Sequence, residues 1–229
     1  MLPKHSFPTY TITLPISKKE IKFRPWVSVE LKSMMTAKLS QDLEKTLDSI
    51  SDIIQECVFD SINLRSDIPY GDLLYLYINC KMKSKDEVIS LNYNATIEDD
   101  GCSEIIPIDL DLRNISMTKI PNKEIRITSE LGIMMKYPSY ELTKKIDDCN
   151  DDYQKIAYLV DYVFDKEKVY DSTSFTQEEL VKWLQELMES EFDKLIDFYE
   201  NLPTITLTLE NIGPKQKNIV LVGIKDFLF

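Results

Sequence analysis

Alternating apolar and polar residues open the chain. Apolar side chains occupy every second position of residues 10–14, with threonines between them, and the same alternation returns in residues 21–23. A period of two is typical of half-buried strands. Pro15 and the polar residues that follow it favour a turn. The sequence therefore predicts an N-terminal β-hairpin.

Apolar residues then recur at three- and four-residue spacing, which is typical of amphipathic helices. Helices are predicted at residues 28–39, 42–58 and 72–83, with Asp72 as a candidate N-cap of the third. Strands follow, and the Asp-Gly dipeptide within residues 98–101 favours a hairpin turn. The predicted strands cover residues 88–97, 103–108, 115–118, 124–128 and 132–137. Together they predict a small central antiparallel sheet.

From residue 140 the apolar spacing is helical again, through about residue 164. A last helix is predicted to run from Thr176 to Leu202. At its start, Thr176 and Glu179 have the spacing of a capping box, and Phe175 can pack on Leu180 as a hydrophobic staple. Residues 204–209 and 219–223 predict a closing hairpin.

These elements predict an α+β protein. A chain of 229 residues with 43% hydrophobic residues can form a sizeable core. We expect residues 1–139 to form an α+β domain with the N-terminal hairpin, helices and central antiparallel sheet. Residues 140–229 are expected to form a helical subregion with the terminal hairpin, packed on the first domain.

Several short motifs, in order along nearly the whole chain, resemble those of baseplate hub proteins of T-even-like contractile-tailed bacteriophages. The clearest is Lys-Phe-Arg-Pro-Trp at residues 22–26, preceded by Pro-Thr-Tyr and Leu-Pro. The others lie at residues 72–76, 135–138, 202–203 and 223–229. Many members of that family carry a Cys-x-x-Cys pair before the last strand, but residues 211–217 contain no cysteine. No metal site can therefore be carried over from the family.

The resemblance implies a role in building the central hub of a phage tail baseplate, with other hub proteins as partners. The chain would act as an assembly chaperone that holds another hub component, or as a structural hub subunit retained in the virion. The resemblance also implies a location in the host cytoplasm during assembly, or in the tail baseplate of the virion. Acidic charge and apolar ends favour the chaperone role, because such a chain can shield a partner surface.

Charge limits the classes of partner. The chain has 39 acidic against 27 basic residues, a net charge of −12. Nucleic acid is disfavoured as a partner, because phosphate binding requires clustered lysines and arginines, whereas a basic partner is compatible with this charge. No apolar run reaches the roughly 18 residues of a membrane span, and the N-terminus lacks the pattern of a signal peptide. We therefore expect a soluble cytoplasmic protein.

Metal binding and nucleophilic catalysis are disfavoured by the positions of the relevant residues. Cys57, Cys80, Cys102 and Cys149 are each separated by more than twenty residues, and His5 is the only histidine. Structural zinc needs clustered thiols or imidazoles, and a nucleophile activated by histidine needs a placed imidazole. We expect buried free thiols and no metal or cofactor.

The alternative of a different class is a hydrolytic enzyme that acts on the cell wall. Adjacent aspartates at residues 99–100, 147–148 and 151–152 could serve as glycosidase carboxylates or magnesium ligands. Neighbouring residues on a helix point apart, however, and aspartate runs in loops are usually solvated. The sequence therefore predicts no catalytic site.

Two motifs are candidates for partner binding. One is Arg24, Pro25 and Trp26, because arginine and large aromatic residues are typical anchors of protein interfaces. Its alternative is a core role in which Arg24 pairs with an acid and Trp26 packs inside. The other candidate is the C-terminal Phe227-Leu228-Phe229, since three large apolar residues must be buried or offered to a partner.

Overall fold

The computed structural model describes residues 6–39, 42–96, 103–210 and 218–227. It is an α+β protein, as predicted, and its contacts divide the chain into two compact units. Unit 1 contains Met1–Asn63, Gly71–Thr118 and Thr204–Phe229, and unit 2 contains Leu64–Tyr70 and Lys119–Pro203. The chain therefore leaves unit 1 and returns to it, so the expected division at residue 139 differs from the observed one.

The N-terminal hairpin of unit 1 is confirmed. Strands β1 (Tyr10–Thr13) and β2 (Glu20–Phe23) pair antiparallel, with Tyr10 opposite Phe23 and Thr13 opposite Glu20. Ile21 and Phe23 are buried. The alternation seen in the sequence therefore places one face of the hairpin in the core of unit 1.

Three helices follow in unit 1: α1 (Ser28–Leu39), α2 (Leu43–Cys57) and α3 (Tyr70–Ser84). Asp42 caps α2 by accepting a hydrogen bond from the amide of Lys45. Almost every residue of α3 from Gly71 to Met82 is buried, so this helix lies at the centre of the unit.

The prediction that Asp72 caps α3 is wrong. The helix begins two residues earlier, and Asp72 lies within its first turn, where its side chain is fully buried. The two carboxylate oxygens accept hydrogen bonds from the amides of Ile16 and Ser17, each at 2.8 Å. Asp72 therefore links the turn of the N-terminal hairpin to the central helix through two hydrogen bonds.

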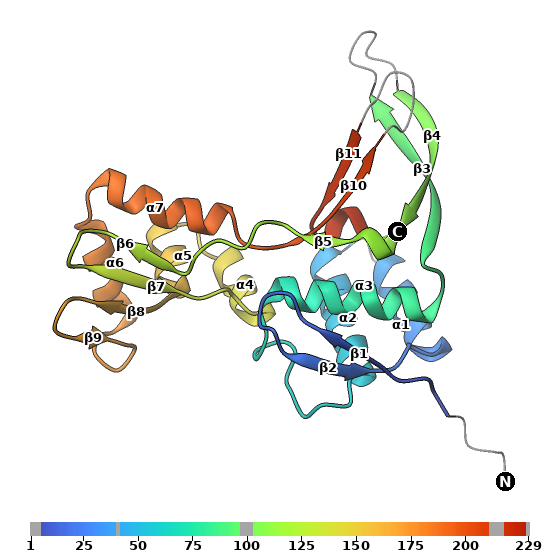
Figure 1. Ribbon diagram of the computed structural model, residues 1–229, viewed down its shortest axis with the longest axis horizontal. Coiled ribbons are helices and arrows are strands. Elements are labelled where there is room, and N and C mark those ends of the chain that lie inside the picture. Colours follow the sequence, from blue (N-terminus) through green and yellow to red (C-terminus); the bar gives the residue numbers. More distant parts are fainter. Residues whose placement is uncertain (1–5, 40–41, 97–102, 211–217, 228–229) are drawn as a thin grey trace. The chain divides into compact units, whose positions relative to one another are not determined.

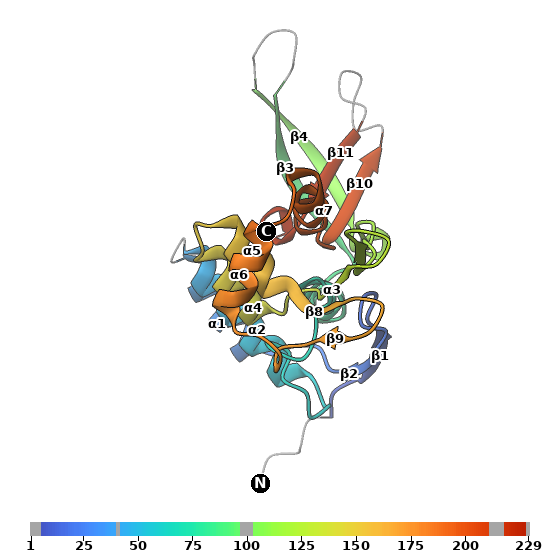
Figure 2. The same ribbon diagram turned by 90° about the vertical axis from the view of Figure 1, so that its left-hand side faces the viewer.

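Unit 1 also contains two small antiparallel sheets. Strands β3 (Val88–Thr96) and β4 (Ser103–Asp111) form a long two-stranded hairpin, and the turn predicted at residues 98–101 lies outside the described residues. Strand β10 (Ile205–Glu210) pairs with β11 (Asn218–Val222) and with the short strand β5 (Ser116–Met117). The closing hairpin is thus confirmed. In Figures 1 and 2 both sheets extend in the same direction from the helices of unit 1.

Unit 2 has a four-stranded antiparallel sheet in the order β6, β7, β8, β9. The strands are β6 (Glu124–Arg126), β7 (Gly132–Met135), β8 (Val160–Phe164) and β9 (Val169–Tyr170). The predicted central strands do pair antiparallel, but they belong to three separate small sheets rather than to one. The helical prediction for residues 160–164 is also wrong, since this segment is rich in valine and aromatic residues and pairs with β7 and β9.

Four helices complete unit 2: α4 (Tyr140–Asp147), α5 (Asp152–Leu159), α6 (Gln177–Gln185) and α7 (Glu189–Glu200). The capping box of Thr176 and Glu179 is confirmed. The single helix predicted from Thr176 to Leu202 is wrong, because the chain breaks between α6 and α7. At the break, Glu191 accepts a hydrogen bond from the amide of Met188 at 3.0 Å, which stabilises a new helix start.

The break lets both helices bury residues in one core. Leu180 and Leu184 of α6 and Leu195 and Phe198 of α7 belong to the same buried cluster as the strands β7 and β8. Among the described residues, no helix combines the length and apolar character that crossing a membrane requires.

Candidate partner-binding site

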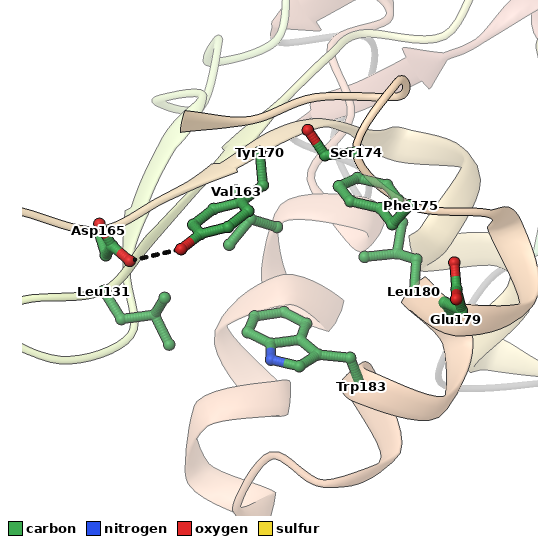
Figure 3. A pocket seen from close by; sticks show the side chains of 9 residues that line it. All are labelled: Leu131, Val163, Asp165, Tyr170, Ser174, Phe175, Glu179, Leu180 and Trp183. Carbon is green, nitrogen blue, oxygen red and sulfur yellow. Dashed lines mark hydrogen bonds between the residues drawn. The ribbon is translucent and has the colours of Figure 1, made fainter. Parts of the chain in front are cut away.

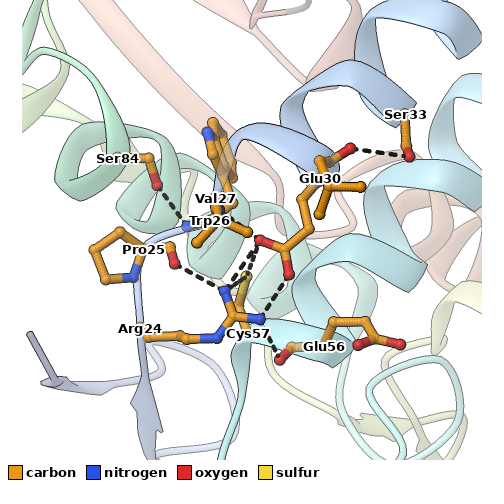
Figure 4. Close-up of polar contacts among 10 residues, drawn as sticks. Arg24, Pro25, Trp26, Val27, Glu30, Ser33, Glu56, Cys57 and Ser84 are labelled. Carbon is orange, nitrogen blue, oxygen red and sulfur yellow. Dashed lines mark hydrogen bonds and ion pairs between the residues drawn. The ribbon is translucent and has the colours of Figure 1, made fainter. Parts of the chain in front are cut away.

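Arg24 lies where β2 leads into α1, and its guanidinium is surrounded by acceptors (Figure 4). Nη2 and Nη1 donate to the two carboxylate oxygens of Glu30 at 2.6 and 3.0 Å. Nη2 also donates to the carbonyl of Glu56 at 3.2 Å, and Nη1 to the carbonyl of Pro25 at 3.0 Å. The side chains of Arg24 and Glu30 are only 16% and 11% exposed. This bidentate pair therefore joins β2, α1 and the end of α2.

Glu30 also supports the start of α1. Its carboxylate accepts a hydrogen bond from the amide of Val27, the residue before the helix, at 2.6 Å. Burial by itself would raise the pKa of Glu30, but the hydrogen bonds from Arg24 and Val27 outweigh it and lower that pKa. The carboxylate is therefore ionised at neutral pH.

Cys57 contacts this ion pair but is not an activated thiol. Its sulfur lies 3.7 Å from Nη1 of Arg24 and 3.9 Å from the carboxylate of Glu30. Burial, with the negative charge of Glu30, raises the pKa of Cys57 to about 12. A protonated thiol is a poor nucleophile, so Cys57 is suited to packing.

Trp26 is buried beside the central helix of unit 1. Its ring stacks on that of Tyr77, with 6.1 Å between ring centroids, and its amide donates to Oγ of Ser84 at 2.9 Å. Pro25 is buried as well. These positions favour the core alternative for Arg24, Pro25 and Trp26. A contact of this motif with a partner stays a prediction.

The C-terminal candidate is only partly described. Phe227 lies in the short helix η2 (Ile224–Phe227) and is fully buried in unit 1, and its carbonyl accepts a hydrogen bond from Nζ of Lys81 at 3.3 Å. Leu228 and Phe229 lie outside the described residues. Phe227 thus contributes to the core, and a role of residues 227–229 in binding stays a prediction.

A further exposed surface of unit 1 is the outer face of α1. None of the twelve residues of this helix is buried. Leu31, Met35 and Leu39 are 37%, 59% and 83% exposed. Their four-residue spacing places them along one side of the helix, with Lys32 and Lys38 beside them. We call these three apolar residues the α1 stripe.

The α1 stripe is not required to hold α1 on unit 1. Helix α1 packs on α2 through its other side, where Met34 and Ala37 are half-buried and the carbonyl of Ala37 accepts from the hydroxyl of Thr46 at 3.3 Å. Isolated helices shorter than about 12 residues are marginal in water. The Arg24–Glu30 pair and the contact with α2 therefore hold a helix whose apolar outer face is left to solvent.

The four-residue spacing of residues 31, 35 and 39 is a sequence signal that these side chains share one side of a helix. The same spacing is also typical of a buried helix face, so the sequence alone does not show that this side is exposed. Only the packing of α1 on α2, through the side that carries Met34 and Ala37, shows that the opposite side is exposed.

The residues considered for metal binding or hydrolysis are dispersed. Cys57 and Cys80 are buried free thiols, Cys149 is free and partly exposed, and Cys102 lies outside the described residues. Asp151 caps α5 by accepting from the amide of Tyr153. Within the described ranges, no three or more His, Cys, Asp or Glu residues are grouped so that they could hold a metal ion.

Comparison with protein families gives a match over most of the chain. A family model described as T4 bacteriophage base plate protein matches residues 7–229. Comparisons with curated proteins and with solved structures found no match. The match covers both units and nearly the whole chain.

Proposed function

The chain belongs to the T4 bacteriophage base plate protein family, and from this premise we propose that it helps to build the central hub of the baseplate by binding another hub protein. Membership of a baseplate family implies interaction with other baseplate proteins of the phage. The hub as the place of action is supported by the sequence resemblance in residues 22–26 and in the motifs that follow it.

The observation that carries the proposal is the α1 stripe. Leu31, Met35 and Leu39 present a continuous apolar line on a helix that buries none of its own residues. Apolar patches on soluble proteins are frequently interaction sites, and amphipathic helices bind through side chains spaced like these. Lys32 and Lys38 flank the line, so the complementary surface is apolar with carboxylates at its edges.

Self-association through the same face is disfavoured by charge. Pairing of two α1 helices would bring Lys32 and Lys38 of one copy close to the same lysines of the other, and like charges in contact are unfavourable. A different protein with an acidic, apolar surface fits better.

Within this role we propose that the protein is an assembly chaperone. A chaperone covers a partner surface and is released, so its own binding face is exposed in the free protein. A hub subunit that stays in the virion is the alternative, and it would use the same face permanently. We propose no catalytic step, which is supported by the single histidine and the spacing of the cysteines.

The test of the binding face is a substitution in the α1 stripe. Met35→Ser should reduce co-purification of other baseplate proteins from infected cells, because truncating an interface anchor costs about 2 kcal/mol of binding, or roughly thirtyfold in affinity. Its melting temperature should stay near that of the parent, since Met35 is 59% exposed. The matched control is Val220→Ser, which alters a side chain of 56% exposure on β11.

If Met35→Ser retains every partner that Val220→Ser retains, the α1 stripe is not the binding face. Mass spectrometry of purified virions beside infected-cell lysate separates the two roles. A chaperone should be present in the lysate and absent from virions, whereas a hub subunit should be present in both. Hydrolysis of cell-wall material by the purified chain would contradict the proposal that it has no catalytic role.

A further inference from the structure

Unit 2 contains a hollow of about 470 Å³ between the sheet and the start of α6 (Figure 3). Three aromatic side chains surround it: Tyr170 from β9, Phe175 from the segment before α6, and Trp183 from α6. Two carboxylates, Asp165 and Glu179, also line it. The hollow therefore combines aromatic rings with negative charge.

Both carboxylates are held in place and ionised. Asp165 accepts hydrogen bonds from the amides of Glu167 and Lys168, each at 2.8 Å, and from the hydroxyl of Tyr170 at 3.0 Å. The two amide hydrogen bonds lower the pKa of Asp165. Glu179 is fixed by the capping box, and the amide of Thr176 lowers its pKa. Their negative charge is thus a permanent part of the hollow at neutral pH.

Among the described residues that line the hollow there is no lysine or arginine. The charge of Lys168 contributes to the lowered pKa of Asp165, and that of Lys182 to the lowered pKa of Glu179. Lys166 pairs with Glu130, and Nζ of Lys168 lies 5.0 Å from the ring centroid of Tyr170. The contact of Lys168 with Tyr170 is a cation–π interaction, so the Tyr170 ring already interacts with a positive charge in this structure.

The net negative charge of unit 2 also favours a cationic partner. The residues of unit 2 include 20 Asp and Glu against 12 Lys and Arg, so this unit carries −8 of the net charge of −12. A cationic partner is therefore attracted before it makes contact.

We propose that this hollow binds an arginine side chain presented by a basic segment of a partner protein. A planar guanidinium can stack on an aromatic ring and donate to carboxylates at the same time. An apolar side chain in the same place would remove water from two ionised carboxylates without replacing their hydrogen bonds, which is unfavourable. This site lies in a different unit from the α1 stripe, and it does not depend on the proposed role in hub assembly.

The two tryptophans of the chain make a direct test possible. Each indole N–H gives its own signal in a nitrogen–proton NMR spectrum of the full chain. Trp183 lines the hollow and Trp26 is buried in unit 1, so Trp26 is an internal control. The probe is the blocked peptide acetyl-Gly-Arg-Gly-amide, and the matched probe contains citrulline, which has nearly the shape of arginine without its charge.

We expect the arginine peptide to shift the Trp183 signal saturably and to leave the Trp26 signal in place. The citrulline peptide should bind about tenfold more weakly, because it lacks the charge-assisted hydrogen bonds and the cation–π contact. Glu179→Gln should weaken arginine binding about fivefold while keeping the capping box, which accepts glutamine. The matched control is Asp161→Asn, an exposed carboxylate on β8 that does not line the hollow.

Three results would overturn the proposal. One is a Trp183 signal that does not respond, and another is equal binding of both peptides, which would identify an apolar pocket. The third is arginine binding that Glu179→Gln and Asp165→Asn leave unchanged. None of these results bears on the α1 stripe, whose test uses other variants and other partners.

Discussion

The buried carboxylate of Asp72 offers the sharpest test of how unit 1 is held together. Replacement by alanine removes the acceptor of two backbone amides, those of Ile16 and Ser17, which approach it at 2.8 Å. Hydrogen bonds to a charged group contribute about 1.5–3 kcal/mol each to stability, and an amide left unpaired in the interior costs about 1–3 kcal/mol. The first turn of α3 also loses a negative charge that its helix dipole favours.

Because the hairpin turn can move toward water and recover part of this loss, we expect Asp72→Ala to lower the free energy of unfolding by about 3 kcal/mol. Asp72→Asn keeps one acceptor oxygen and should lose about half as much. For a chain of this size, 1 kcal/mol corresponds to roughly 2–4 °C in melting temperature. The alanine variant should therefore melt roughly 6–12 °C lower.

The assay is denaturant unfolding followed by the fluorescence of Trp26, in a Trp183→Phe background so that the signal reports on unit 1. Asp86→Ala is the control, because Asp86 is an exposed aspartate of the same unit. Unfolding of Asp72→Ala at the same denaturant concentration as Asp86→Ala would refute the assignment of Asp72 as an anchor. Hydrogen exchange at Ile16 and Ser17 gives a second readout, and it should accelerate in the alanine variant.

Three further predictions concern single positions. Thr176→Ala should lower the free energy of unfolding by about 1 kcal/mol. In the double mutant Thr176→Ala/Glu179→Ala, the loss should be smaller than the sum of the two single losses, because both residues belong to one capping box. A double mutant whose loss equals that sum would contradict this coupling. Gly132→Ala should destabilise unit 2 by about 1–3 kcal/mol, since the added Cβ would overlap the ring of Phe164 on the neighbouring strand. An unchanged melting temperature would refute the close approach of the Phe164 ring to Gly132. The pKa of Glu30 is lowered in the folded protein, so the ionised Glu30 stabilises the fold above its unfolded pKa of about 4.5, and this stabilisation is lost as pH falls through the folded pKa. The stability of Glu30→Gln should therefore depend less on acid than that of the parent. Equal dependence of stability on pH in the two proteins would show that the ion pair does not stabilise the fold.

Features fixed by neighbouring residues could be predicted from the sequence. The alternation in residues 10–14 and 21–23 gave the N-terminal hairpin, and the spacing of Thr176 and Glu179 gave the start of α6. Each of these signals depends on atoms within a few residues of one another. Local periodicity and capping chemistry therefore sufficed for them.

Features that depend on distant partners could not be predicted. Strand β5 pairs with β10, which comes after the whole of unit 2, so no local pattern shows to which sheet it belongs. Residues 160–164 satisfy a helical spacing as well as a strand, and pairing with β7 decides between them. Asp72 has the sequence context of an N-cap, and only the folded hairpin places two amides against it.

Arg24 and Trp26 were predicted either to bind a partner or to serve the core. The structure gives them a bidentate pair with Glu30 and a stacked contact with Tyr77, and their binding of a partner stays a prediction. The α1 stripe was overlooked because its exposure depends on which side of α1 faces α2. Exposure is a property of packing between elements, and a single sequence reports mainly the elements themselves.

The chain leaves unit 1 after Thr118 and returns at Thr204, and these two residues are held together. The amide of Thr118 donates to the carbonyl of Thr204 at 2.8 Å, and the amide of Thr204 donates to Oγ1 of Thr118 at 3.0 Å. During synthesis, every residue of unit 2 is therefore made before β10, β11 and η2 of unit 1. Until the ribosome has made those last elements, α3 remains without the cover of Phe227. Completion of unit 1 is thus a late event in the life of the nascent chain, because its sheet of β5, β10 and β11 can form only after all of unit 2 has been made.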